Sequence, residues 1–205
     1  MLEKLKNHKS TLIGIEELRK YAVCIPLMPG PDGYEVLFEV RSANIKSQPG
    51  DICFPGGRME PGETPDETAV RETMEELLVE EKQLRLIGLM DPYLSESGNL
   101  VYPYAAVLED YQGSFGRAEV ESVFSVPLSF FLETEPEVYH TAIEVHPGED
   151  FPFERIHGGK NYAWRKGKKK VIFYSCEGRV IWGMTARIMY SFADIYRKEV
   201  LEENL

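Results

Sequence analysis

The chain has 205 residues, of which 43% are hydrophobic and 28% charged, and its formal net charge at pH 7 is -11. This composition is typical of a globular protein with a packed core, and it excludes the disordered and fibrous classes. The length predicts one domain over residues 1–205. The acidic balance argues against a nucleic-acid partner, because nonspecific affinity for DNA or RNA depends on many lysine and arginine contacts to phosphates.

The first quarter of the chain predicts a helix, a hairpin and a long loop. Apolar residues recur at helical spacing over residues 11–20, which predicts a short amphipathic helix. The apolar runs 21–28 and 34–40 flank the five residues Pro-Gly-Pro-Asp-Gly, which is the pattern of a β-hairpin. Residues 41–57 are polar and rich in glycine and proline around a short apolar piece at 52–54. They predict a functional loop that contains a brief strand.

Residues 64–79 carry the pattern of a helix that follows directly on this loop. Thr64 or Asp66 can cap its start, and Pro65 suits an early helical position. The apolar and small residues predicted to form its buried stripe are Ala69, Val70, Thr73, Met74 and Leu77.

The rest of the chain alternates predicted strands with two further helices. The predicted strands span residues 84–90, 100–108, 120–126, 138–145 and 171–176. A short helix is predicted over residues 127–132 and a terminal helix over residues 182–203. This order predicts the α+β class, with a mixed β-sheet sandwiched between α-helices (α/β/α) and a helix near each terminus.

The cysteines and the N-terminal stretch give an expectation for the cellular location of the protein. Cys24, Cys53 and Cys176 are widely spaced and form neither a CxxC pair nor a zinc-ligand pattern, which favours reduced thiols inside the cell. The N-terminal stretch lacks the apolar run of a signal peptide, and no later run reaches membrane-spanning length. A cytoplasmic location without membrane attachment is therefore the default expectation.

Three glutamates of the predicted helix over residues 64–79 share one face. At about 100° per residue, Glu72, Glu75 and Glu76 fall within an arc of roughly 100°. Like charges at this spacing repel, and a divalent cation that prefers hard oxygen ligands, Mg²⁺ or Mn²⁺, would compensate them. The backbone carbonyl of Gly56 could complete such a site, because glycine lets the backbone approach closely. The alternative is a solvated helix face on which Arg71 and Glu75 form an i,i+4 ion pair.

The spacing of these residues resembles the signature of the Nudix hydrolase family. The matching residues are Gly57, Glu63, Arg71, Glu72, Glu75, Glu76 and Val79. Thr73 departs from the signature because an aliphatic residue is usual there, but its methyl group can still pack. Leu78 replaces the usual glycine, which normally permits a left-handed turn, so the helix is expected to run on or to exit differently.

The resemblance implies the Nudix fold and a metal-dependent attack of water on a diphosphate that joins a nucleoside to another group. It implies Mg²⁺ or Mn²⁺ as the cofactor, and such ions neutralise the diphosphate and lower the pKa of a bound water. The implied metal ligands are Glu72, Glu75, Glu76 and the carbonyl of Gly56. The implied catalytic residues are Glu75, together with Glu63 paired to Arg71.

A general base outside the signature is common in this family, and its place varies. Glu119 and Glu121 are candidates because they lie at the start of the strand predicted at 120–126, which could return toward the site. Glu119 is taken as the catalytic candidate. The alternative for each residue is a solvent-exposed acid at a strand edge.

The segment before the signature resembles that of the coenzyme A pyrophosphatase branch. The matching residues are Arg41-Ser42, Lys46, Gly50 and Phe54-Pro55-Gly56-Gly57, with lysine in place of the commoner arginine. Arg41 and Lys46 would supply substrate-binding cations beside an anionic site. The implied reaction splits coenzyme A or its derivatives into 3′,5′-ADP and 4′-phosphopantetheine. The lysines at 166 and 168–170 could meet the 3′-phosphate, although a solvated turn is the preferred interpretation.

Other interpretations remain open at this point. The signature also fits a pyrophosphatase for ADP-ribose or another nucleoside diphosphate derivative. A non-catalytic Nudix module usually loses signature carboxylates, whereas this chain keeps them. An enzyme that acts on RNA caps is disfavoured by the acidic charge and by the absence of a basic stripe. The expected partner is a small nucleotide-type molecule, with neither nucleic acid nor membrane, and a homodimer is compatible with the sequence.

Overall fold

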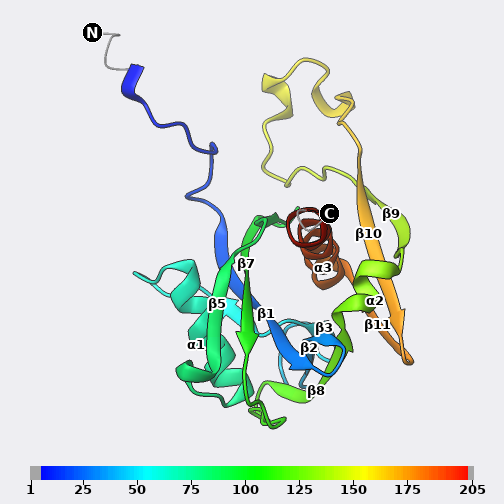
Figure 1. Cartoon of the computed structure of the whole chain (residues 1–205). Coiled ribbons are helices and arrows are strands. Elements are labelled where there is room, and N and C mark those ends of the chain that lie inside the picture. Colours follow the sequence, from blue (N-terminus) through cyan, green and yellow to red (C-terminus); the bar gives the residue numbers. More distant parts are fainter. Residues whose placement is uncertain (1–5, 203–205) are drawn as a thin grey trace.

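The structure, a computed structural model, describes residues 6–202 and is built around an eight-stranded mixed β-sheet (Figure 1). In the middle of this sheet, β1 (Arg19–Gly30) pairs antiparallel with β2 (Gly33–Arg41) and parallel with β7 (Asn99–Leu108). The other strands of the sheet are β3 (Ile52–Cys53), β4 (Gly56–Arg58), β5 (Leu84–Leu89), β6 (Tyr93–Leu94) and β8 (Val120–Pro127). The parallel pair among antiparallel ones confirms that the sheet is mixed.

Helices lie on both faces of the sheet because successive residues of a strand point to opposite sides. On β2, Leu37 lies in one apolar cluster with Leu77 of α1, whereas Phe38 packs against Phe131 of α2 in a larger cluster. The helices are α1 (Pro65–Leu77), α2 (Leu128–Glu133) and α3 (Gly183–Tyr196), after which comes the π-helical turn η5 (Arg197–Leu201). The predicted α+β class, with helices on both sides of a mixed sheet, is confirmed.

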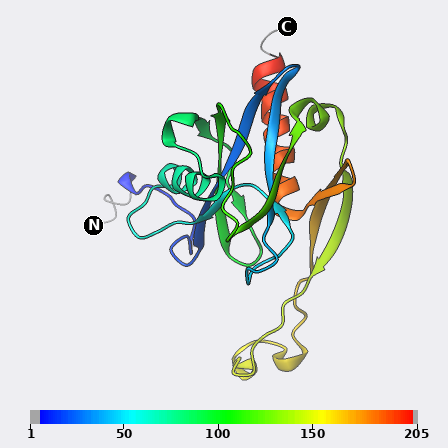
Figure 2. The same cartoon turned by 90° about the horizontal axis from the view of Figure 1, so that it is seen from below.

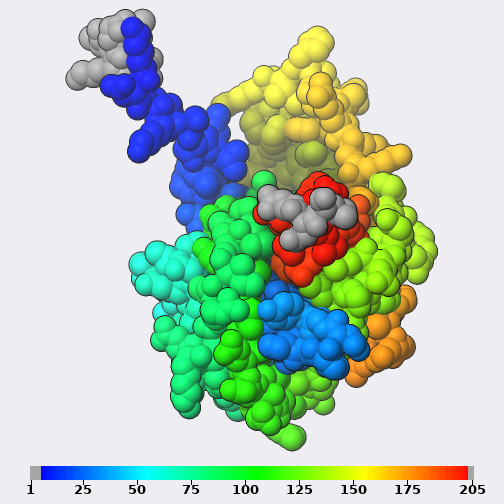
Figure 3. Space-filling model, viewed as in Figure 1, coloured from blue at the N-terminus to red at the C-terminus, as the bar shows by residue number. Residues whose placement is uncertain are grey.

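A second sheet of three antiparallel strands packs against α3 (Figure 1). Its strands are β9 (Glu137–Ile143), β10 (Gly167–Cys176) and β11 (Arg179–Trp182). Residues 144–166 between β9 and β10 form an arm that extends away from the rest of the molecule (Figure 2). Short helical turns are also formed by η2 (Glu81–Gln83) and, within the arm, by η3 (Phe153–Arg155) and η4 (Gly159–Asn161). In the space-filling view, the arm and the N-terminal segment stand out from the body (Figure 3).

The helix predicted over residues 11–20 is wrong. Residues 13–17 form turns, and β1 already begins at Arg19. Gly14 has a φ of 81°, which is incompatible with a right-handed helix. Leu12 and Ile13 are exposed, so these two side chains meet no core that would stabilise a helix.

Other differences concern a turn and several short strands. The hairpin loop has two residues instead of five, because pairing continues to Gly30 and Gly33. The sequence pattern gave no signal for β4, β6 or β11, which have only two to four residues each. The terminal helix starts at Gly183 because the residues before it form β11. Within residues 6–202, no helix is long and apolar enough to cross a membrane.

Candidate active site

The helix α1 presents the glutamates, and its two ends are well defined. At its start the backbone N–H of Thr64 donates to Glu67 Oε2 at 2.8 Å, and Pro65 is the first helical residue. At its end Leu78 adopts a left-handed conformation, with φ 52° and ψ 46°. The helix therefore stops where the glycine of the Nudix signature would stop it, and the expected run-on or different exit is wrong. Thr73 is buried, and its hydroxyl donates to the Ala69 carbonyl at 2.6 Å.

An ion-pair network joins the loop before α1 to the helix. Arg71 Nε donates to Glu63 Oε1 at 2.7 Å, and Arg71 Nη2 donates to Glu63 Oε2 at 3.1 Å. The hydrogen bonds from Arg71, from the backbone of Glu60 and from Thr68 lower the pKa of Glu63 to about 2. Arg71 Nη1 also lies 2.9 Å from Glu72 Oε1 and 3.4 Å from Glu75 Oε2. Arg71 thus holds three carboxylates near one another.

The three glutamates differ in exposure, so the helix face is not uniformly solvated. Glu76 is only 5% exposed, whereas the Glu75 side chain is 61% exposed. The N–H of Gly56 donates to Glu76 Oε2 at 2.7 Å, yet burial still raises the pKa of Glu76 to about 7. Burial also raises the pKa of Glu72. The interpretation as an ordinary solvated face is therefore wrong for Glu76 and Glu72.

Two glycines let β4 approach its neighbours closely. A Cβ atom on Gly57 would overlap the carboxylate of Glu72, and a Cβ atom on Gly56 would overlap the backbone carbonyl of Ala22. Gly56 also has a φ of 154°, which favours glycine. The glycine pair consequently brings the backbone of β4 directly against the carboxylates of α1.

A pocket of about 550 Å³ opens beside these groups, and a volume of this size is typical of small-molecule sites. Its charged lining residues, which come from α1 and from three other places in the chain, are Arg41, Arg58, Glu72, Glu75, Glu76 and Glu119. Apolar walls come from β1 and α3, with Tyr21, Val23, Met184 and Ile188. The pocket also includes Gly56 and Gly57.

Other candidate residues lie outside this pocket. Lys46 is exposed and does not line it, although Ser47 and Gln48 of the same loop do. Glu119 lines the pocket but Glu121 does not. Lys166 pairs with Glu144 and Lys169 with Glu96, and no lysine of 166 and 168–170 lines this pocket. The lysine cluster therefore does not form part of the pocket that holds the glutamates.

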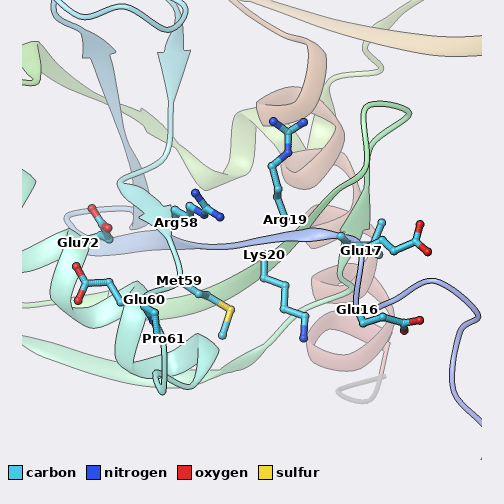
Figure 4. A pocket seen from close by; sticks show the side chains of 10 residues that line it. Glu16, Glu17, Arg19, Lys20, Arg58, Met59, Glu60, Pro61 and Glu72 are labelled. Atoms are coloured by element: carbon cyan, nitrogen blue, oxygen red, sulfur yellow. The ribbon is translucent and has the colours of Figure 1, made fainter. Parts of the chain in front are cut away.

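A larger hollow of about 940 Å³ adjoins the pocket and shares Arg58 and Glu72 with it. Figure 4 shows Arg58 from β4 and the cations Arg19 and Lys20 from β1 on the walls of this hollow. Glu60 and two acids of the N-terminal segment also line it, so its charge is mixed. These cations were missed by sequence reasoning, because only the pairing of β1 with β4 brings them together.

Glu39 of β2 is a further residue that sequence reasoning missed. It is 1% exposed, and its pKa is raised well above the usual range by burial and by the nearby Glu76. A signal did exist, because Glu39 is the single charged residue within the apolar run 36–40.

The carboxylates of the pocket offer oxygen ligands for a divalent cation but are not preassembled around one. Within residues 6–202, no three His, Cys, Asp or Glu side chains are already gathered tightly enough to hold a metal ion. Glu72 and Glu75 are instead drawn to Arg71, and Glu76 to the Gly56 amide. The donor chemistry nevertheless fits, because the pocket is lined by oxygen ligands of the kind that Mg²⁺ and Mn²⁺ prefer, and Oε1 of the nearby Glu39 is buried without a hydrogen-bond partner.

Comparison with known proteins places this geometry in a family. The model of the NUDIX domain matches residues 18–155, which is more than half of the chain. The chain belongs to the Nudix hydrolase family. The Nudix match covers both the glutamate helix and the end of β2 that carries Arg41.

Individual Nudix relatives are similar over different shares of the chain. Peroxisomal coenzyme A diphosphatase NUDT7 of Mus musculus is 36% identical over 134 residues, 64% of this chain and 56% of the relative. Peroxisomal coenzyme A diphosphatase ndx-8 of Caenorhabditis elegans is 40% identical over 110 residues, 51% of this chain and 46% of the relative. The uncharacterized Nudix hydrolase NudL of Photorhabdus laumondii is 30% identical over 177 residues, 85% of this chain and 83% of the relative. The matches thus span about half the length of the first curated relatives.

Proposed function

We propose that this protein is a divalent-metal-dependent pyrophosphatase that hydrolyses coenzyme A or its derivatives to 3′,5′-ADP and 4′-phosphopantetheine. The observation that carries the proposal is the pocket in which Arg41 lies together with Glu72, Glu75 and Glu76. The names of two similar relatives, both coenzyme A diphosphatases, support the choice of substrate. Arg41 belongs to the segment that resembles the coenzyme A branch, so the two lines of support concern the same part of the chain.

The glutamates of α1 are proposed as the ligands of Mg²⁺ or Mn²⁺. Glu72, Glu75 and Glu76 would hold the ion together with the backbone carbonyl of Gly56. When bound, such an ion neutralises the diphosphate and lowers the pKa of a water that attacks phosphorus. Because Glu76 is buried, its charged form is costly without a cation nearby, which favours ion binding at this place.

Further residues are proposed to position the carboxylates of α1 or to take the proton from the attacking water. Glu63 holds Arg71, and Arg71 holds Glu72 and Glu75, so this pair fixes the carboxylates before substrate arrives. Glu119 lies on the pocket wall and is proposed as the group that takes the proton from water, with Glu75 as the alternative. Both side chains are exposed enough to exchange that proton with solvent.

The substrate's own negative charge needs cations in an otherwise acidic protein. Arg41 is proposed to bind a phosphate with its guanidinium. Lys46, in the loop that follows β2, is proposed to approach the substrate from the rim of the pocket. Arg58 is shared by the pocket and the adjoining hollow, where Arg19 and Lys20 also lie. These three cations are proposed to meet a second phosphate, because they line the hollow or the pocket and none of the lysines at 166 and 168–170 does.

Product analysis tests the proposal directly. The purified chain is incubated with coenzyme A or with ADP-ribose, in the presence of Mg²⁺, Mn²⁺ or a chelator, and the products are separated by chromatography. We expect 3′,5′-ADP and 4′-phosphopantetheine with either ion and no reaction with the chelator. Rapid cleavage of ADP-ribose without cleavage of coenzyme A would identify the alternative enzyme, a pyrophosphatase for nucleoside diphosphate derivatives.

We further propose a single Nudix domain that acts in the cytoplasm on a small molecule. The word peroxisomal in the names of two relatives makes the peroxisome the alternative location, which imaging of the tagged chain distinguishes. A homodimer is the proposed assembly, and light scattering measures the mass against the 23.4 kDa of one chain. A non-catalytic module is disfavoured because the chain keeps all signature carboxylates.

A further inference from the structure

Glu39 is a buried carboxylate whose charge has no obvious place in the fold. It lies on β2 two residues after Leu37, so both side chains point to the sheet face that α1 covers. Glu39 is 1% exposed, and its Oε1 atom is buried without a hydrogen-bond partner among the described residues. Buried polar atoms normally find a partner, so an orphaned carboxylate oxygen points to a group that joins it during function.

The surroundings of Glu39 are acidic rather than neutralising. Glu76 of α1 is the charge with the largest effect on it, and Glu119 and Glu72 also raise its pKa. Arg41 opposes these effects, but its Nε donates to the Ser47 carbonyl at 3.2 Å. Burial and the proximity of Glu76 therefore leave two carboxylates close together at low solvent exposure.

The remaining neighbours supply no positive charge. The thiols of Cys24 and Cys53 lie near Glu39, and burial raises the pKa of each thiol to about 12. They are therefore neutral at physiological pH and add no positive charge to that of Arg41. A cation among Glu39, Glu72 and Glu76 would satisfy the orphaned oxygen and relieve the repulsion.

We propose that Glu39 is an additional carboxylate of the divalent-cation site, binding the ion from β2 beneath the glutamates of α1. The inference rests on the proposed function, because it assigns a further ligand to the same site. It assigns a ligand outside the Nudix signature and explains why a charged residue interrupts the apolar run 36–40. The chemical class of the ligand is a hard divalent cation with oxygen coordination.

The test compares Glu39→Gln with the wild type and with the control Glu35→Gln, using Mn²⁺ as the probe. Glu35 lies on the same strand and points to the same side as Glu39, but it borders a different hollow and pairs with Ser125. Mn²⁺ affinity is measured by electron paramagnetic resonance, and thermal unfolding is recorded with and without Mn²⁺. We expect Glu39→Gln to bind Mn²⁺ between about 10-fold and 100-fold more weakly. The control should bind Mn²⁺ as the wild type does.

The metal-free proteins separate a ligand from a merely structural residue. Replacing the buried carboxyl group by an amide should leave the metal-free melting temperature unchanged or higher, while the increase caused by Mn²⁺ becomes smaller. Mn²⁺ affinity within about twofold of wild type in folded Glu39→Gln would overturn the inference. If Glu39→Gln does not fold, Glu39→Asp keeps the charge but withdraws it by one carbon, and wild-type affinity in that variant would overturn the inference equally.

The outcome for Glu39 is distinguishable from the outcome for the proposed function. Wild-type protein that cleaves coenzyme A, beside a Glu39→Gln variant with unchanged Mn²⁺ affinity, contradicts only the role of Glu39. Wild-type protein that binds Mn²⁺ through Glu39 but cleaves no diphosphate contradicts only the proposed function.

Discussion

Leu78 ends α1 in a conformation that is costly for any residue with a Cβ atom. Its φ of 52° and ψ of 46° lie in the left-handed region, which costs a residue with a Cβ atom about 1–2 kcal/mol of conformational free energy. The side chain is 60% exposed, so little packing is lost when it is removed. We expect Leu78→Gly to raise the free energy of unfolding by about 1 kcal/mol, measured by urea denaturation. Leu78→Ala removes the side chain but keeps the strain, and an equal gain in that control would contradict the backbone explanation.

Glu63 predicts a specific sensitivity to acid. Its pKa is lowered to about 2 in the folded protein, chiefly by the hydrogen bonds from Arg71, whereas an unfolded glutamate titrates near 4.5. The unfolded state therefore binds the proton first, and the contribution of Glu63 is complete above about pH 5 and lost as the pH falls toward 2. We therefore expect the melting temperature of Glu63→Gln to fall less than that of the wild type as the pH is lowered from about 5 to about 2. Glu80→Gln, on an exposed ion pair, should keep the wild-type slope.

Glu76 predicts a large effect on turnover with little effect on folding. Glu76→Gln removes a proposed ligand of the ion, and loss of several kcal/mol of transition-state stabilisation corresponds to about 10²–10³-fold in kcat. Glutamine can still accept the hydrogen bond from the Gly56 amide, so the helix position should persist. Steady-state kinetics with coenzyme A and a circular dichroism melt measure the two effects. Near-normal kcat in a folded variant would contradict the metal-binding role.

At the scale of elements, the contact between β4 and α1 controls where Glu72 lies. A Cβ atom at Gly57 would overlap the Glu72 carboxylate, which would have to move. We expect Gly57→Ala to lower kcat/KM by about 10²-fold, because a displacement of about 1 Å can have this effect. Gly88→Ala is the matched control, since a Cβ there meets no atom within 4 Å. Equal activities of the two variants would show that the position of Glu72 is not critical.

The elements that sequence reasoning predicted are those with local signals. The helix of residues 65–77 has a proline at its start and a clear apolar stripe, and the hairpin of β1 and β2 has a recognisable turn. The helix expected over residues 11–20 failed because Gly14 adopts a left-handed conformation and Leu12 stays exposed. The strand β4 escaped notice because its partner β1 lies far away in the chain, whereas β6 and β11 pair with neighbouring strands but are too short to show an alternating pattern.

The candidate site shows the same division between local and distant signals. The spacing along one helix was sufficient to single out Glu72, Glu75 and Glu76. The approach of Arg41 and Glu119 to them depends on β2 pairing with β8, which no local pattern reveals. Glu39 is more informative still, because its proximity to Glu76 depends on the packing of α1 over the sheet face of β2.

At the scale of the whole molecule, the arm of residues 144–166 is distinct from the machinery around α1. None of its residues lines the pocket, and it extends away from the body (Figure 2). Its aromatic side chains pack on one another, with Phe151 against Phe153 and Trp164, and Trp164 against Tyr162. The arm is therefore held mainly by contacts within itself, and the core does not depend on it.

Removal of the arm tests this independence. Ile143 and Gly167 are paired in the register of β9 and β10, so an Asn-Gly turn can join them in place of residues 144–166. The exposed pair of Lys166 and Glu144 is lost, which costs at most about 1 kcal/mol. We expect the melting temperature to fall by less than about 4 °C, with kcat and KM for coenzyme A unchanged. A raised KM with normal stability would instead show that the arm contacts the substrate, whereas a large drop in melting temperature would show that the core depends on it.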